Sequence, residues 1–244
     1  MRRFIIDASL VQNGRAPLSR EEAAHALRVL RMKDGDEAQA LDANGGAWRA
    51  ILRVSGDGGA SLELMERARD TESPARVTLY MGIPKGEKLE IIAQKLTELG
   101  AARLVPVRME RCVAKIDEKD AEKKLTRLRR IAQEAEKQSG RTREMEISPP
   151  MTFKDAAEDI KSHETKLVLW EEAEGFRLAD ARAQMPNARD IAFVVGPEGG
   201  ITRAEAETLL DAGANLVTMG PRILRAETAA VAGCAVIMSL WGDL

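Results

Sequence analysis

Two patterns of apolar and polar positions alternate along the last two thirds of the chain. Short apolar runs rich in β-branched residues stand at residues 77–83, 103–107, 166–170 and 191–195, and such runs are typical of buried strands. Between them lie longer segments, for example residues 88–100, in which apolar residues recur every three or four positions and predict amphipathic helices. Because strands and helices alternate, this part is predicted to be an α/β domain with a mainly parallel sheet.

The first part of the chain has a different pattern. LSREEAAHALRVLR (residues 18–31) predicts a helix that begins with a capping box of Ser19 and Glu22. Three strand-like segments follow, EAQALD, AWRAILRV and ASLELMERA, separated by the turn-forming ANGG and SGDGG. We therefore predict two domains, a small barrel-like module at residues 1–72 and the α/β domain at residues 73–244.

Two glycine-containing loops follow predicted strands near the end of the chain. GPEGG (residues 196–200) comes after AFVV, and MGPRILRAETAA (residues 219–230) begins where NLVTM ends. In parallel α/β sheets, ligands bind outside the carboxyl ends of the strands, and glycine lets backbone approach a ligand closely. Either loop alone is equally well explained as a tight strand-to-helix turn. Together, with Arg222/Arg225 and Glu227/Thr228 set between apolar segments, they favour a small-molecule site built mainly from main chain.

Composition and charge limit the possible functions. The 244 residues carry a formal net charge of −2 and are 3% aromatic, so neither a global basic field nor base-stacking platforms are expected. Cys112 and Cys234 lack a CxxC or histidine-rich partner, which disfavours zinc and predicts a buried reduced thiol at Cys234. GIPKGEK (residues 82–88) lacks P-loop spacing, no GxGxxG follows the first strand of the α/β domain, and GxSxG and HExxH are missing. With neither a signal peptide nor a membrane span, we expect a cytoplasmic protein that binds no membrane and no metal.

Local basic groups are nevertheless candidates for RNA contact. The basic residues of the first domain are nearly all arginines, whose planar guanidinium groups suit phosphate oxygens and base edges. Acidic residues balance them, so a solvated surface of mixed charge is the alternative. One candidate group lies at helical spacing on the predicted first helix, and another lies where a long charged helix (residues 120–139) gives way to a loop. The candidate RNA-binding residues are Arg3, His25, Arg28, Arg31, Gln138 and Arg141.

The final predicted helix, AETAAVAGCAVIMSLW (residues 226–241), is apolar around almost its whole circumference beyond Thr228. A helix of this kind has to be buried on all sides. Burial against an identical subunit and an internal position within one domain both satisfy that requirement, and the sequence does not choose between them.

Four motifs in this order resemble the bacterial ribosomal RNA small-subunit methyltransferase E family, the uridine-N3 methyltransferases of the SPOUT class. They are KGEKLEIIAQKLTELGAARLVPV, EAEKQSGR, GPEGGIT and MGPRILRAETA, and HALRVLRMKDGDEAQALDANGGAWRAIL is similar to that family's PUA-like barrel. The resemblance implies a PUA-like RNA-binding domain at residues 1–72 and a SPOUT domain with a deep trefoil knot at residues 73–244. It also implies S-adenosylmethionine as cofactor, 16S rRNA or the small ribosomal subunit as substrate, and a homodimer with the active site at the subunit interface.

The same resemblance implies which residues form the site. Loops after the last strands surround the cofactor, since backbone groups in tight glycine turns can bind the adenine edge. Uridine N3 loses a proton on methylation, so Arg225 is predicted to stabilise charge on O2 and O4, and Glu198 or Glu227 to accept the proton. Alternatively, Glu198 only holds its loop and Glu227 only complements the helix dipole. The candidate cofactor-binding residues are Leu169, Trp170, Glu171, Val195, Gly196, Pro197, Glu198, Gly199, Gly200, Met219, Gly220, Ile223, Leu224, Arg225, Thr228 and Ala229.

Two other functions remain compatible with these residues. One is a methyltransferase of the same class that acts on another RNA or another base atom, because no residue visibly reads the base. The other is a non-catalytic RNA-binding or ribosome-assembly factor, against which tight binding of S-adenosylmethionine would argue.

Overall fold

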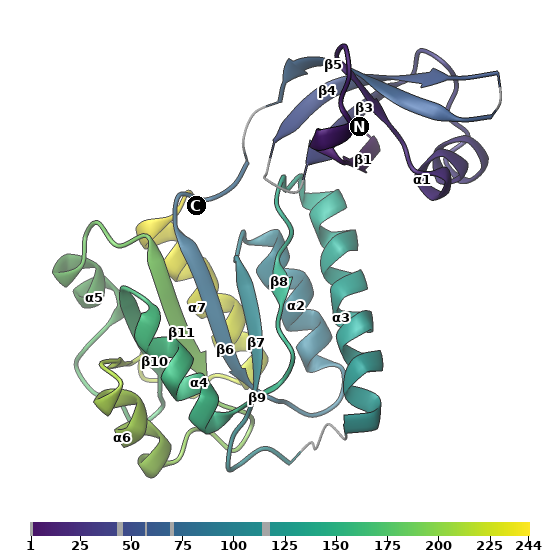
Figure 1. The fold of residues 1–244 in the computed structure, drawn as a ribbon. Helices are drawn as coiled ribbons and strands as arrows, with labels where there is room; N and C mark the ends of the chain where they lie inside the picture. Colours follow the sequence, from purple (N-terminus) through teal and green to yellow (C-terminus); the bar gives the residue numbers. More distant parts are fainter. Residues whose placement is uncertain (1, 43–45, 57, 69–70, 114–117) are drawn as a thin grey trace. The chain divides into compact units, whose positions relative to one another are not determined.

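The structure is a computed structural model of the chain. It describes residues 2–42, 46–56, 58–68, 71–113 and 118–244. The chain forms two compact units (Figure 1). The first unit comprises Met1–Glu72 and Gly140–Glu144, and the second comprises Ser73–Ser139 and Met145–Leu244.

The first unit is built on a curled sheet that forms a half-barrel. Its elements are β1 (Arg2–Ile6), η1 (Ala8–Leu10), β2 (Arg15–Pro17), α1 (Arg20–Ala24), η2 (His25–Val29), β3 (Glu37–Asp42), β4 (Ala47–Val54) and β5 (Ala60–Arg67). The strand order is β1-β3-β4-β5-β2, in which β1 runs parallel to β3 and the other pairs are antiparallel. Phe4, Leu52 and Leu62 fill the core because alternate side chains of each strand point inward.

The first helix is shorter than the sequence pattern predicts. Ser19 caps α1 by accepting a hydrogen bond from the Glu22 N–H (3.1 Å), which is one half of the predicted capping box. Beyond α1, η2 is one wide helical turn of the π type. Arg31 then has a φ of 52°, and the Met32 N–H bonds to the Ala26 carbonyl oxygen (3.0 Å). Because a left-handed residue followed by such a bond ends a helix, the prediction that the helix includes Arg31 is wrong.

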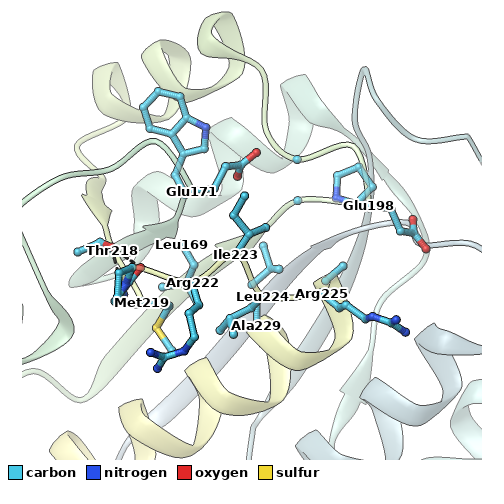
Figure 2. A pocket seen from close by; sticks show the side chains of 18 of the residues that line it. Leu169, Glu171, Glu198, Thr218, Met219, Arg222, Ile223, Leu224, Arg225 and Ala229 are labelled. Carbon is cyan, nitrogen blue, oxygen red and sulfur yellow. Dashed lines mark hydrogen bonds between the residues drawn. The ribbon is translucent and has the colours of Figure 1, made fainter.

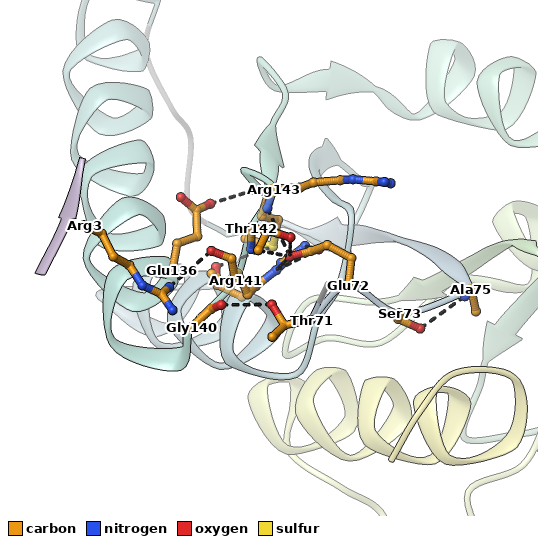
Figure 3. A network of polar contacts seen from close by, with 12 residues as sticks. Arg3, Thr71, Glu72, Ser73, Ala75, Glu136, Gly140, Arg141, Thr142 and Arg143 are labelled. Carbon is orange, nitrogen blue, oxygen red and sulfur yellow. Dashed lines mark hydrogen bonds and ion pairs between the residues drawn. The ribbon is translucent and has the colours of Figure 1, made fainter. Parts of the chain in front are cut away.

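A buried ion pair ties Glu72 to the segment 140–144 within the first unit (Figure 3). The Glu72 carboxylate accepts hydrogen bonds from the Arg141 guanidinium (2.7 Å) and from the backbone N–H groups of Thr142 (2.7 Å) and Arg143 (3.0 Å). The side chains of Glu72 and Arg141 are only 7% and 6% exposed. Buried charges are tolerated when each is paired and hydrogen-bonded, so this contact anchors the segment in its unit.

The second unit is an α/β domain with a parallel sheet, as predicted. Its elements are β6 (Arg76–Gly82), α2 (Lys88–Glu98), β7 (Arg103–Arg108), α3 (Glu118–Ser139), β8 (Glu146–Ile147), β9 (Met151–Thr152), α4 (Phe153–Asp159), η3 (Ile160–Ser162), β10 (Thr165–Leu169), α5 (Leu178–Gln184), β11 (Asp190–Val195), α6 (Arg203–Asp211), β12 (Asn215–Val217) and α7 (Ala226–Trp241). The strand order is β12-β10-β11-β6-β7-β8, with β9 also paired to β7, and all these pairs are parallel. The carboxyl ends of β10, β11 and β12 therefore meet at one edge. The deep trefoil knot stays a prediction.

Helices cover both faces of this sheet (Figure 1). α2, α3, α5 and α7 pack on one face, and α4 and α6 pack on the other. Each face of the sheet has its own hydrophobic core, and neighbouring residues of β11 point into different ones. Phe193 packs in the core beneath α2, α3, α5 and α7, and Val194 packs in the core beneath α4 and α6. Burial on both faces explains why the strands appear in the sequence as continuous apolar runs.

The helix α7 is buried on one side only within this chain. Ala230, Cys234 and Ile237 are fully buried against the sheet, and Cys234 is a free thiol, as predicted. Val236 on the other side is 39% exposed, so α7 does not occupy an internal position within one domain, and its burial against an identical subunit stays a prediction. Among the described residues, no helix, α7 included, is long and apolar enough to span a membrane.

Candidate active site

A cavity of about 430 Å³ lies at the carboxyl ends of β10, β11 and β12 (Figure 2). Parallel pairing of β10 with both β11 and β12 brings together loops that are far apart in the sequence. The predicted cofactor residues that line it are Leu169, Trp170, Glu171, Val195, Gly196, Pro197, Glu198, Gly200, Met219, Gly220, Ile223, Leu224, Arg225 and Ala229. Gly199 and Thr228, also predicted, are outside this lining. The volume is within the range of small-molecule sites.

The GPEGG loop (residues 196–200) turns tightly directly after β11. A Cβ atom at Gly196 would stand 2.8 Å from the carbonyl carbon of Gly200 and 3.0 Å from the backbone nitrogen of Ile201. Gly200 has a φ of +76°, and its N–H donates a hydrogen bond to the Pro197 carbonyl oxygen (2.9 Å). Close backbone approach at the first position and a left-handed conformation at the second both require glycine. The loop therefore presents main chain to the cavity.

Side chains from outside the GPEGG loop hold it in place. The indole Nε1 of Trp170 donates a hydrogen bond to the Ile201 carbonyl oxygen (3.1 Å). From the other direction, Arg111 Nη1 donates one to the Gly199 carbonyl oxygen (2.8 Å). The loop is thus fixed before a ligand binds, which lowers the entropy cost of binding.

The loop between β12 and α7 forms another wall of the cavity (Figure 2). Gly220 has a φ of +102°, and its N–H donates to Thr218 Oγ1 (3.2 Å). Ile223 is 88% exposed although it lines the cavity, so a ligand that covers it would bury apolar surface. Arg225 is the exposed N-cap residue of α7. Main chain, apolar side chains and two arginines, Arg222 and Arg225, thus share this wall.

Two carboxylates and one ammonium group meet beside the cavity. Lys88 Nζ lies 3.0 Å from Glu198 Oε1 and 3.2 Å from Glu227 Oε2. Burial acts to raise the pKa of Glu198, but hydrogen bonds from Lys88 and from backbone N–H groups outweigh it and lower that pKa. The pKa of Glu227 is lowered by its own backbone N–H, and by Lys88 and the charge of Arg225, against the effect of burial. Both glutamates are therefore ionised at neutral pH and less basic than ordinary carboxylates.

Lys88 and Arg111 are site residues that the sequence pattern did not single out. Lys88 begins α2 after β6, and Arg111 follows β7, so both stand beyond the carboxyl ends of parallel strands. The rule that singled out GPEGG applies to them as well. However, the residues around Lys88 do not match a phosphate-binding motif. The sequence also gives no sign that Lys88 pairs with Glu198 and Glu227, which are far from it along the chain.

The predicted RNA-binding residues lie in different environments. His25, Arg28 and Arg31 are exposed, but Arg31 lies outside the helix, so the three do not form a strip at helical spacing. The guanidinium of Arg141, predicted to face RNA, is instead buried in the ion pair with Glu72.

The remaining two RNA candidates also differ. Arg3 is half-buried, which lowers its pKa, and its Nη1 donates to the Arg141 carbonyl oxygen (3.2 Å). Gln138 is exposed in the last turn of α3. Exposure thus favours His25, Arg28, Arg31 and Gln138, and RNA contact by any of the six stays a prediction.

Comparison with known proteins agrees with this fold. A model of the RNA methyltransferase domain matches residues 71–238, and a model of the RNA methyltransferase PUA domain matches residues 18–65. The ribosomal RNA small subunit methyltransferase E of Bacillus subtilis is 34% identical over 237 residues, which cover 94% of this chain and 93% of that protein. Its counterpart in Mycobacterium bovis is 32% identical, with coverage of 98% and 92%.

A solved structure is similar over the whole chain. The ribosomal RNA small subunit methyltransferase E from Neisseria gonorrhoeae, bound to S-adenosyl methionine, superposes with a TM-score of 0.86 at 34% identity and covers 100% of this chain and 99% of its own. The fold and the matched domains are therefore those of the RNA methyltransferase class. Within that class the chain belongs to the ribosomal RNA small subunit methyltransferase E family, as the four motifs predict.

Proposed function

We propose that the protein transfers a methyl group from S-adenosylmethionine to N3 of a uridine in 16S rRNA. The observation that carries the proposal is the cavity between two glycine-containing loops at the carboxyl edge of the parallel sheet. Membership of the methyltransferase E family supports small-subunit rRNA as the substrate, and the S-adenosyl methionine bound to the Neisseria gonorrhoeae relative supports the cofactor.

The residues around the cavity fit this cofactor. Gly196 and Gly200 line the cavity without side chains, and backbone N–H and C=O groups can bind an adenine edge. Ile223 offers apolar surface, and the ionised Glu198 beside the cavity complements a positively charged ligand. When bound, S-adenosylmethionine supplies a methyl group on a cationic sulfur.

Arg225 is our candidate for the catalytic side chain. Loss of the N3 proton places negative charge on O2 and O4, which a guanidinium group stabilises until the methyl transfer neutralises it. We assign Glu198 and Glu227 to holding the GPEGG loop and the start of α7, because a carboxylate with a lowered pKa is a poor proton acceptor. The proton then leaves to solvent.

The proposed activity can be tested with cofactor labelled on its methyl group. The purified protein is incubated with small ribosomal subunits from a bacterial strain that lacks the corresponding enzyme, and the rRNA nucleosides are analysed by mass spectrometry. We expect label in 3-methyluridine from 16S rRNA. Label in another nucleoside would reassign the base atom, and no label would favour a non-catalytic RNA-binding role.

We also propose that the first unit binds RNA through exposed arginines. Replacing Arg28 and Arg31 by glutamine should weaken RNA binding and reduce the slope of log K against log salt by roughly 0.7 for each phosphate that is no longer neutralised. S-adenosylmethionine affinity should not change. Binding assays between about 50 and 200 mM salt measure the slope, and the control is Arg182→Gln, which changes an arginine of α5 in the second unit. An unchanged slope in the Arg28/Arg31 variant would assign these residues to a solvated surface.

We further propose a homodimer that covers the open side of α7. Val236→Glu would place an unpaired charge in that contact, so we expect the variant to sediment as a monomer and the wild type as a dimer. Leu210→Glu is the control, because Leu210 is similarly exposed (44%) on α6, on the opposite face of the sheet. Ile237 is unsuitable as a probe since it is fully buried in the chain's own core. A wild type that sediments as a monomer contradicts the proposal.

A further inference from the structure

The ammonium group of Lys88 connects three segments around the cavity. Lys88 is the first residue of α2, and its Nζ pairs with Glu198 of the GPEGG loop (3.0 Å) and with Glu227 in the first turn of α7 (3.2 Å). The backbone N–H of Lys85 also donates to Glu198 Oε1 (3.0 Å). The three charged side chains are only 21–29% exposed, so water screens these ion pairs less than it screens surface pairs.

Lys88 and Glu198 line the cavity, and Glu227 lies in the first turn of α7 beside the lining residue Ala226. β6, which precedes α2, is an interior strand of the sheet between β11 and β7. At its end, the backbone of Gly82 lies so close to Pro197 that a Cβ atom would stand 2.5 Å from Pro197 Cδ. The turn from β6 to α2 is therefore packed directly against the GPEGG loop, and Lys88 carries that contact on to α7.

Other charged groups surround the trio of Lys88, Glu198 and Glu227. Arg225 lies near Glu227 and lowers its pKa, Arg111 binds the Gly199 carbonyl oxygen, and Glu171 stands beside Gly200. Arg222 lines the same cavity. Within the trio itself, one ammonium group faces two carboxylates, so the trio carries one net negative charge.

We propose that Lys88 is a positioning residue of the cofactor site: it holds the GPEGG loop and the start of α7 at the spacing that the ligand requires. Both carboxylates lie within 3.2 Å of the same nitrogen, so without the ammonium group they would repel each other and the two walls would separate. The proposal rests on the proposed function in that the ligand is S-adenosylmethionine.

Two substitutions at Lys88 and one control on the same helix test this role. Lys88→Met keeps the aliphatic stem and removes the charge, and Lys88→Arg keeps the charge. Lys95→Met is the matched control, because Lys95 pairs with Glu98 (2.8 Å) on α2, away from the cavity lining. Calorimetry should show that Lys88→Met weakens S-adenosylmethionine and S-adenosylhomocysteine alike by at least about tenfold. Lys88→Arg should retain most of the affinity, and Lys95→Met all of it.

The second measurement needs no ligand and separates positioning from a general loss of stability. Carboxyl carbon NMR titration follows Glu198 and Glu227 directly, and both pKa values should rise in Lys88→Met but not in Lys95→Met. Unchanged ligand affinity in Lys88→Met would overturn the proposal, and so would an unchanged titration of both glutamates. If the wild type binds neither ligand, the proposed function fails, and the NMR titration alone decides whether Lys88 holds the two carboxylates.

Discussion

Gly196→Ala should lower the affinity for S-adenosylmethionine by at least about 100-fold while the chain stays folded. A Cβ atom at this position meets the backbone of Gly200 at 2.8 Å and of Ile201 at 3.0 Å, and neither contact can be relieved by rotating a side chain. The GPEGG loop would have to open, and the main-chain groups that line the cavity would move with it. We expect the free energy of unfolding to fall by about 1–3 kcal/mol, as for other overpacked sites.

Gly175→Ala is the matched control for this prediction. Gly175 has a φ of +78°, so alanine there is strained by roughly 1–2 kcal/mol, yet a Cβ atom would meet nothing within 4 Å and the residue is outside the cavity lining. Thermal unfolding should show comparable destabilisation of the two variants, and titration calorimetry should show weakened binding only for Gly196→Ala. If Gly196→Ala bound the cofactor as tightly as the wild type, the GPEGG loop would not be a wall of the cofactor site.

The parallel sheet and the place of the cavity could be predicted because both depend on local patterns. A strand buried on both faces appears as a continuous apolar run, and β11, with Phe193 and Val194 in different cores, is an example. Once strands and helices alternate, the carboxyl ends of the strands share an edge, so GPEGG and the loop before α7 are expected to meet. The cavity that they line confirms that they do.

The sequence predictions are wrong or incomplete where a long-range contact or an unusual backbone conformation determines the structure. Arg31 lies just after its helix in a left-handed conformation that glycine usually adopts. The helical periodicity of the sequence gives no sign that the helix stops before it. Arg141 has the sequence context of a solvent-facing loop cation, whereas Glu72, distant in sequence, buries it. Lys88 escapes prediction for the same reason, since its two partners are brought to it only by the tertiary fold.

The largest kinetic effect is expected from Arg225→Ala, which should lower kcat by about 100- to 1000-fold at saturating RNA and cofactor. The negative charge that Arg225 is proposed to stabilise develops on O2 and O4 as N3 loses its proton. The neutral uridine that binds does not carry this charge, so the effect should be on turnover and not on substrate binding. Arg225 caps α7 without a side-chain hydrogen bond to the helix, and its side chain is exposed, so the fold should tolerate alanine.

The control is Arg203→Ala, which removes an exposed arginine at the start of α6, outside the cavity lining, and should leave kcat unchanged. Arg225→Lys should fall between the wild type and Arg225→Ala, because an ammonium group keeps the charge but lacks the planar pair of donors. Steady-state kinetics with varied RNA, together with calorimetry for the cofactor, separate the two roles. An Arg225→Ala variant with a raised KM for RNA and an unchanged kcat would make Arg225 an RNA-positioning residue, and the assignment of charge stabilisation to it would be wrong.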